Sequence, residues 1–388
     1  MLFFSCPVSL VDFGVYCRCK LAEEIAGVDP EEHDWDFNQG PLIFRQEPLH
    51  LLKTLELPEV LYGQGYPASI LCSIMEHCPA IETLKLSSVK NMNVVRAVSR
   101  TIAENCSHIT DLSISESVGG LLLSMMEQIQ GSQLEKIHDF RSLTNASNTI
   151  SMAAITRHSD TIRKINFHAS AFGSASIQAI LFSCRALEEF QNHDLGMNNA
   201  IPLIDVVAKE WACTRIRCLE LGVCVTPSGR NPRYLADPMM ANWKEEDHRH
   251  WEMLDRLYTQ IGSLSELVTL DLKADGTTWR DNNDYRTIPY TKTCLPGLLA
   301  LEDAEAGQIG FLSRWAGLTK LRVLRGSVLW TGPEARERIG EREVEWFATY
   351  LPALRRATFY NINDMETFLG TAPETIRDLH RRRPELQL

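Results

Sequence analysis

The pattern apolar-x-x-apolar-x-apolar returns along this chain at intervals of about 25 to 29 residues. The clearest copies occupy residues 52–57, 81–86 and 109–114, and the series continues at residues 162–167, 216–221 and 267–272. Alternating apolar positions in a window of this length predict a short strand with one buried side. The near-constant interval predicts that these strands belong to repeated units of one kind.

The stretches between the windows carry apolar residues at helical spacing. Two of these stripes are Ile70, Leu71, Ile74, Met75, Cys78 and Val94, Val95, Val98, Ile102, Cys106. Each unit is therefore predicted to contain a strand, a loop, a helix and a return loop, which is the crossover that successive parallel strands need. The alternation predicts an α/β fold, namely a leucine-rich-repeat solenoid with a concave parallel sheet and helices on its convex side.

Two windows depart from the pattern. In the window 134–139 the last apolar position is taken by Asp139, and the following Phe140 suggests a bulge. In the window 187–192 the same position is taken by Asn192. The strand register at these two windows is expected to be either regular or shifted by one residue.

The position three residues before each window holds only small or apolar side chains. Cysteine takes this position four times, at Cys78, Cys106, Cys184 and Cys213. Because cysteine behaves as a small hydrophobe, a helix end packed tightly against the sheet explains the choice. The chain has 11 cysteines, an odd number without a paired framework. Five of them, Cys72, Cys78, Cys106, Cys184 and Cys213, fall in helix-like apolar segments, so we expect buried, reduced thiols and a reducing compartment.

Further along the chain, two successive intervals between windows are each about twice the usual length. This places insertions near residues 222–262 and 273–310 of a repeat domain that spans residues 49–388. The first insertion opens as a loop rich in proline, glycine and asparagine and runs into an amphipathic helix around Trp251. The second is polar and aromatic and precedes a helix expected over residues 298–315. Insertions in repeat proteins map to loops on one face, often the binding face.

The chain carries 50 acidic and 39 basic residues and a formal charge of −11. This balance argues against nucleic-acid binding and against binding to an acidic membrane surface. The apolar amino terminus lacks the basic residues of a signal peptide, and no segment has the length and apolarity of a transmembrane span. We therefore expect a cytoplasmic or nuclear location.

Two segments carry a resemblance to a known family. Residues 105–114, Asn-Cys-Ser-His-Ile-Thr-Asp-Leu-Ser-Ile, and residues 183–190, Ser-Cys-Arg-Ala-Leu-Glu-Glu-Phe, resemble the cysteine-containing leucine-rich repeats of F-box/LRR proteins. The resemblance covers residues 49–388. It implies repeats that recognise a substrate and an amino-terminal F-box that docks on the adaptor of a cullin-based ubiquitin ligase. No F-box motif is evident, so residues 1–48 are expected to be a degenerate cap or a truncated F-box region.

Sequence motifs of catalysis are missing from the chain. It contains no Walker-type glycine loop, no His-Glu-x-x-His and no Gly-x-Ser-x-Gly, and we predict no catalytic residue, no cofactor and no metal site. Residues 247–250, Asp-His-Arg-His, could ligate a metal together with Glu245 or Glu246. We favour a solvated first helical turn, with the acids at its positive end.

The predicted recognition surface is the row of side chains that alternate outward along the strands. Its members are Lys85, Asp111, Ser113, Lys164, Asn166, His168, Glu220, Asp271 and Arg325, with Tyr360 just beyond the last strand. Taken singly, each also fits plain solvation. Trp279, Tyr285 and Tyr290 in the second insertion fit either of two roles. They are interface anchors, because tyrosine and tryptophan dominate interface energetics, or they pin the loop to its own scaffold.

These features predict a protein-interaction scaffold without chemistry of its own, because an open solenoid face excludes water poorly. The first hypothesis is an F-box/LRR-like substrate-recognition protein for a ubiquitin ligase. Its partners would be a protein on the concave face and, if an F-box exists, the ligase adaptor. The alternative is a leucine-rich-repeat regulator of an enzyme, of the GTPase activator or inhibitor type, with an arginine or an acidic patch on a rim loop.

Overall fold

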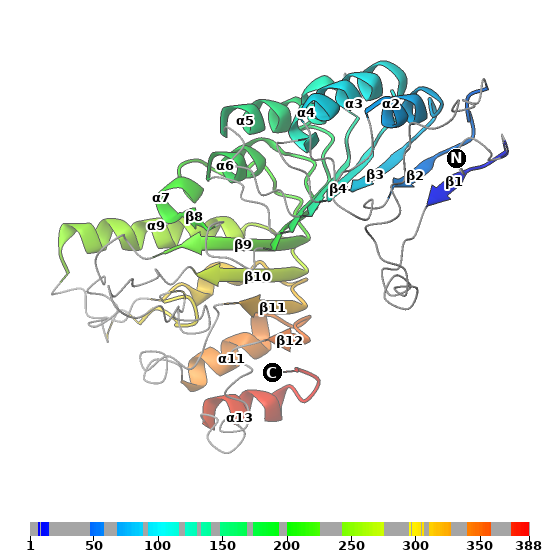
Figure 1. The fold of residues 1–388 in the computed structure, drawn as a ribbon. Coiled ribbons are helices and arrows are strands. Elements are labelled where there is room, and N and C mark those ends of the chain that lie inside the picture. The colour runs from blue at the N-terminus through cyan, green and yellow to red at the C-terminus, as the bar shows by residue number, and fades with distance from the viewer. Residues whose placement is uncertain are drawn as a thin grey trace, which may run out of the picture. The chain divides into compact units, whose positions relative to one another are not determined.

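The fold was obtained as a computed structural model. It describes residues 7, 9–14, 47–57, 68–87, 92–115, 121–129, 133–140, 148–168, 174–193, 200–225, 243–274, 295, 297–303, 305, 310–326, 340–357 and 374–387. Two compact units make up the chain, Met1–His158 and Ser159–Leu388 (Figure 1).

The first unit is a parallel sheet with helices packed beside one another. Its strands, each paired in parallel with the next, are β1 (Asp12–Gly14), β2 (Thr54–Leu57), β3 (Thr83–Ser87), β4 (Asp111–Ser115) and β5 (Lys136–Phe140). Its helices are α2 (Ala68–Glu76), α3 (Met92–Asn105), α4 (Leu121–Gln128) and α5 (Asn148–Arg157), and each packs on the next. Thus α2 lies between β2 and β3 in the chain, α3 between β3 and β4, and α4 between β4 and β5. The last helix, α5, follows β5 and ends the unit.

The second unit repeats this arrangement. Its strands are β6 (Lys164–His168), β7 (Glu189–His193), β8 (Ile201–Pro202), β9 (Cys218–Cys224), β10 (Thr269–Ala274), β11 (Val323–Gly326) and β12 (Arg356–Ala357). The first half of β9 pairs in parallel with β7 and its second half with β8, and β9, β10, β11 and β12 then pair in order. Its helices are α6 (Ser174–Ser183), α7 (Leu203–Val206), α9 (Glu245–Gly262), the 3-10 helix η4 (Leu312–Trp315), α11 (Glu341–Tyr350) and α13 (Glu374–Arg382).

Rows of apolar side chains, one from each strand, form the cores. In the first unit Leu55, Leu84, Leu112 and Ile137 are neighbours in register, and all are buried. In the second unit the equivalent row is Ile165, Phe190, Leu219, Leu270 and Leu324. Burial of one such side chain contributes about 1.5–3 kcal/mol. The predicted windows are therefore confirmed as parallel strands of an α/β protein. The first apolar residue of each window is also buried, immediately ahead of its strand.

The two irregular windows keep a regular register. β4 and β5 pair residue for residue, with Ile114 opposite Asp139 and Ser115 opposite Phe140, so the suggested bulge is wrong. Asn192 lies opposite Phe167 and is buried in the position that the pattern assigns to an apolar residue. The backbone pairing of the neighbouring strands therefore fixes the register even where a polar residue replaces an apolar one.

The four cysteines ahead of the windows are free and buried, as predicted. Cys72, also predicted to be buried, is free but only half-buried. The Sγ of Cys106 lies 3.5 Å from the carbonyl oxygen of Met75 and 3.6 Å from that of Cys78, so it donates to the end of the preceding helix. Burial raises the pKa of the Cys106 thiol from 9.0 to about 12, and it raises the pKa of Cys184 and of Cys213 to about 12 as well. A small side chain with a weak donor fits this position beside the end of the preceding helix.

The raised pKa values predict protected thiols and a loss of stability in alkali. We expect Cys106 to react with an aromatic disulfide reagent at least about 100-fold more slowly in the folded protein than after denaturation. Because its folded pKa of about 12 exceeds the ordinary 9.0, the contribution of the neutral thiol is complete below pH 9 and falls as the pH rises toward 12. Urea midpoints should decline less steeply over this range in Cys106→Ala. Equal slopes in the two proteins would contradict the assignment.

The described parts of the two insertions differ from the sequence-based expectation. β9 continues to Cys224, beyond the window, because Gly222 and Val223 pair with β10. The helix expected over residues 298–315 is wrong for the described residues, which form a turn at residues 297–299 and the 3-10 helix η4. Gly297 has φ of +68°, which lies outside the helical region.

The insertions supply part of the core of the second unit. The ring centroids of Trp243 and Trp251 lie 5.2 Å apart, those of Trp251 and Phe311 4.6 Å, and those of Tyr258 and Phe311 5.0 Å. These four side chains are buried. Offset and edge-on aromatic pairs at such distances are favourable beyond their buried area. The aromatic residues therefore join α9 to the segment that precedes η4.

The first turn of α9 is less solvated than expected. Asp247 and His250 are both buried, and Asp247 Oδ2 accepts a hydrogen bond of 3.0 Å from the backbone N–H of Lys244. Burial lowers the pKa of the His250 imidazole. Carboxylates at the start of a helix interact favourably with its dipole. These residues therefore fix the helix start.

Candidate functional site

One face of each sheet is polar and partly open. Along β2 and β10 buried residues alternate with half-buried ones, and the helices of each unit lie on the buried side (Figure 1). Parallel sheets ordinarily have both faces covered by helices, and their strands are then apolar throughout. The strands of this protein instead carry polar residues on the second face. This polar face is the first candidate site.

In the second unit the polar face brings together several of the predicted residues. Asn166, Gln191, Glu220, Asp271 and Arg325 are successive neighbours in register across β6, β7, β9, β10 and β11. The amide Nδ2 of Asn166 donates to Oε1 of Gln191 at 3.0 Å. Neighbouring strands lie about 4.8 Å apart, so the five side chains form one continuous polar row.

Glu220 differs from the prediction in its exposure. It alternates onto the polar face, yet its relative exposure is only 5 %. Its Oε1 accepts a hydrogen bond of 2.8 Å from Nζ of Lys273, whose side chain is 30 % exposed. Burial of a carboxylate is costly unless it is paired and hydrogen-bonded. We therefore assign Glu220 an organising role on this face and not a freely accessible one.

Removal of the lysine is expected to destabilise the second unit. Lys273→Met takes away one partner of the buried Glu220 carboxylate and should lower the free energy of unfolding by about 1–3 kcal/mol. Glu220→Gln in the same background should recover part of the loss. A double-mutant cycle on urea denaturation measures the coupling, and additive single effects would contradict the importance of this pair.

In the first unit the polar face is crossed by ion pairs between neighbouring strands. Nζ of Lys85 lies 3.2 Å from Oε2 of Glu56. Asp111 lies 3.6 Å from Nζ of Lys136 and 3.9 Å from Nε2 of His138. Ser113 is the register neighbour of Lys85 and of His138. The predicted residues of this unit therefore lie on one face, and the charged ones are paired across strands.

Lys164 completes the described part of the predicted surface, with its Nζ 2.6 Å from Oε1 of Glu189. Cys218 lies beside this pair and accepts a hydrogen bond of 3.5 Å from Nε2 of Gln191. Burial, followed by the charges of Glu189 and two more carboxylates, raises the pKa of the Cys218 thiol. The remaining predicted residues, Trp279, Tyr285, Tyr290 and Tyr360, and the side chain of His168, lie outside the described residues.

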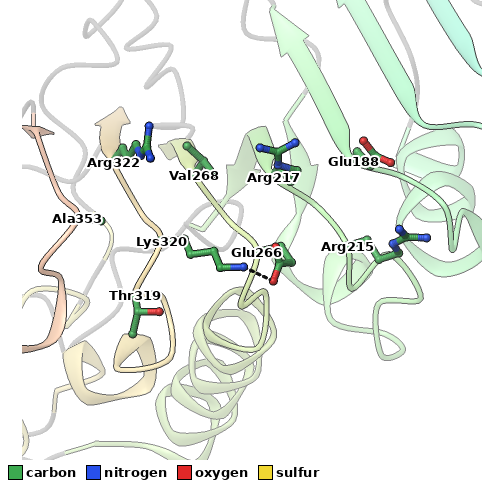
Figure 2. Close-up of a pocket in the computed structure, with 9 residues that line it drawn as sticks. All are labelled: Glu188, Arg215, Arg217, Glu266, Val268, Thr319, Lys320, Arg322 and Ala353. Atoms are coloured by element: carbon green, nitrogen blue, oxygen red, sulfur yellow. Dashed lines mark hydrogen bonds and ion pairs between the residues drawn. The ribbon is translucent and has the colours of Figure 1, made fainter.

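A second candidate site was missed by the sequence analysis. It is a hollow of about 580 Å³ in the second unit, at the edge where the strands begin, and we call it the edge groove (Figure 2). Its charged lining consists of Arg215, Arg217, Lys320, Arg322, Glu188 and Glu266. Ligand-holding clefts have volumes of about 300–1,000 Å³. The edge groove is therefore large enough for several side chains of a partner.

The backbone places the lining of the edge groove in two tiers. The residue just ahead of each strand donates its N–H to the carbonyl oxygen of the equivalent residue, just ahead of the preceding strand. These bonds measure 2.7 Å from Arg217 to Glu188, 2.8 Å from Val268 to Arg217 and 2.8 Å from Arg322 to Val268. The second tier lies two residues earlier in each loop and contains Arg215, Glu266 and Lys320. In Figure 2 the side chains of Arg217, Val268 and Arg322 point the same way.

The charges in the edge groove are only partly paired. Nζ of Lys320 lies 2.5 Å from Oε1 of Glu266, and Nη1 of Arg163 lies 3.3 Å from Oε1 of Glu188. The hydrogen bond and the charge of Lys320, with a smaller contribution from Arg217, lower the pKa of Glu266. Among the residues that the structure describes, no carboxylate forms an ion pair with Arg215, Arg217 or Arg322.

A signal for the edge groove was present in the sequence. The second residue of the window is arginine four times, at Arg163, Arg217, Arg322 and Arg355. The predicted recognition surface includes only the outward positions within each strand and not the residue just ahead of the strand. Equivalent residues of parallel strands lie side by side, so arginines at one window position must line one edge of the sheet.

Other kinds of site find no support in the described part of the chain. No group of three or more histidine, cysteine, aspartate or glutamate side chains is placed there to hold a metal ion. No helix among these residues combines the length and apolarity needed to cross a bilayer. No protein-family model matches the chain, and no curated protein matches its sequence. The class that the fold defines is an α/β protein whose parallel strands carry a polar, half-buried face.

Proposed function

We propose that this protein is a leucine-rich-repeat solenoid that binds a protein partner through the polar face of its sheet. The observation that carries the proposal is that face itself. It is built from parallel strands, the helices that the structure describes lie on its other side, and its side chains are aligned in register. Repeat proteins bury a core between stacked units and bind partners along the extended surface that remains.

The composition of the polar face suits a protein partner. It combines carboxylates, lysines, amides and hydroxyl groups that are half-buried along their strands, such as Asp111, Ser113 and Asn166. Side chains held by a rigid sheet lose little conformational freedom when a partner binds, so more of the contact energy contributes to affinity. Alternating charges across neighbouring strands favour one docking register over others.

Within this class we propose a substrate-recognition role of F-box/LRR type. The support is the recurrence of cysteine three residues before the strand windows. These residues are Cys78, Cys106, Cys184 and Cys213, and each is buried and free. This feature accompanies the resemblance of residues 105–114 and 183–190 to the cysteine-containing repeats. Recruitment to a ligase would also require a segment that binds the adaptor. Within residues 1–48 the structure describes β1, which pairs with β2.

Site-specific photo-crosslinking in cells tests the binding face. A photoreactive amino acid at Gln191 or Ser113 on the polar face should give discrete adducts with a partner protein. The same amino acid at Glu252 on α9 or Arg100 on α3, both exposed on helices, should not. Adducts formed equally from the helix positions would overturn the proposed face.

Binding to the ligase adaptor tests the finer proposal. A verified full-length chain should retain the purified adaptor in a pull-down, and competition with a known F-box fragment should release it. If the full-length chain retains no adaptor while the polar face still forms its adducts, the ligase role is removed and the binding function stands.

A further inference from the structure

The edge groove concentrates positive charge in a protein that is acidic as a whole. The chain has a formal charge of −11, yet the groove is lined by four basic and two acidic side chains. Both acidic side chains already pair with basic ones, Glu266 with Lys320 and Glu188 with Arg163. The excess charge of the groove therefore comes from the exposed Arg215, Arg217 and Arg322.

These arginines are held at a regular spacing. Arg217 leads into β9 and Arg322 into β11, with Val268 ahead of β10 between them. Neighbouring strands lie about 4.8 Å apart, so the backbones at Arg217 and Arg322 lie roughly 10 Å apart. A peptide in the extended polyproline II conformation has three residues per turn and advances about 3.1 Å per residue, so its residues i and i+3 lie on one face, about 9 Å apart.

The chemistry of the lining favours carboxylates as ligands. Guanidinium groups form paired hydrogen bonds with carboxylates, and these bonds are stronger than those between neutral groups. The neutral residues of the described lining are Val268, Thr319 and Ala353, and none of them offers an aromatic ring for base stacking. Proteins that hold single-stranded nucleic acid rely on such rings. Charge and lining together point to a protein segment.

We propose that the edge groove binds an acidic, extended segment of a protein partner, with acidic residues three positions apart on Arg217 and Arg322. Arg215 and Lys320 flank the segment from the second tier. This inference rests on the proposed function for its biological role, since the groove would form one border of the partner-binding surface. The Lys320–Glu266 pair limits affinity, because the Glu266 carboxylate competes for the same positive charges.

A fluorescence-anisotropy titration tests the groove directly. The probe is a fluorescein-labelled peptide of about twelve residues, with glutamate at every third position among glycine and serine. A peptide with glutamine in place of glutamate and a single-stranded oligouridine serve as comparisons. We expect the full-length protein to bind the glutamate peptide, with affinity that falls as salt is added. Equal binding of the glutamine peptide, or tighter binding of the oligouridine, would overturn the proposal.

One variant expected to weaken peptide binding and one expected to strengthen it distinguish an effect of the groove from a general effect of charge or folding. Arg217→Glu with Arg322→Glu should weaken peptide binding by at least about tenfold. Arg100→Glu with Arg249→Glu makes the same change of net charge on exposed helix positions and should have little effect. Glu266→Gln removes the competing carboxylate and should tighten binding by about twofold to fivefold. A misfolded protein cannot produce that gain, and its absence together with an unchanged double variant would refute the assignment.

The two proposals can fail independently. The titration uses an isolated peptide and needs no natural partner, so the peptide can fail to bind while cross-links from the polar face persist. Conversely, loss of the cross-links at Gln191 and Ser113 leaves a positive peptide result unchanged.

Discussion

Replacing Leu270 with aspartate is expected to unfold the second unit. Leu270 is fully buried in β10 and is the register neighbour of Leu219 and Leu324. Leu→Ala at such sites costs about 2–5 kcal/mol, and a buried carboxylate without a partner adds to that cost. The total approaches the whole stability of an ordinary domain, about 5–15 kcal/mol. Tryptophan fluorescence in urea, which reports on Trp251 and Trp315, should show the loss.

A graded series on the same strand provides the control. Leu270→Ala should shift the urea midpoint by an intermediate amount. Thr269→Ala, at a half-buried position one residue earlier, should change the free energy of unfolding by no more than about 1 kcal/mol. If Leu270→Asp and Thr269→Ala had similar effects, the buried row of aliphatic residues would not carry the fold.

Replacing Gly326 with alanine is expected to have the second largest effect. Gly326 ends β11 with φ of +95°, a conformation that costs other residues about 1–2 kcal/mol. A Cβ at this position would lie 2.2 Å from the carbonyl oxygen of Leu272 and 2.8 Å from Oδ1 of Asp271. Because the neighbour is backbone, the strands must move apart. We expect a loss of about 2–4 kcal/mol in thermal or urea denaturation.

Gly222 supplies a matched control in the same sheet. A Cβ added there would meet Cα of Ala200 at 3.5 Å, which is ordinary contact. Gly222→Ala should therefore change stability by less than about 1 kcal/mol. Gly326→Ala should also disturb the polar face, because it displaces Asp271, and so weaken partner adducts formed from Gln191. A stable Gly326→Ala protein would contradict the close approach of β10 and β11.

The parallel strands could be predicted from two periods. Apolar residues alternate within each window, the windows recur at roughly 25 residues, and few other assignments satisfy both. Asn192 shows the limit of the pattern, since the sequence alone left its register open and the pairing with Phe167 decides it. The helix expected over residues 298–315 failed because apolar spacing cannot reveal close backbone approach. A Cβ at Gly310 would lie 2.1 Å from the carbonyl oxygen of Ala300, so these segments run against each other.

The polar face was predicted residue by residue, but its energetics were not. Alternation placed Glu220 on the correct face, whereas its burial depends on Lys273, a residue that the pattern did not single out. The edge groove was missed for another reason. Its side chains come from residues 188 to 353, and only the stacking of strands brings them together. The position ahead of each strand is informative only once that stacking is assumed.

The hydrogen bonds that link Glu188, Arg217, Val268 and Arg322 involve only backbone atoms. The side chains of Arg217, Val268 and Arg322 take no part in these bonds, so they can be exchanged one at a time, whereas Glu188 also pairs through its side chain with Arg163. A change of partner preference would then need no compensating change in the interior. Related chains should vary most in charge at this border while the aliphatic rows beneath it stay constant.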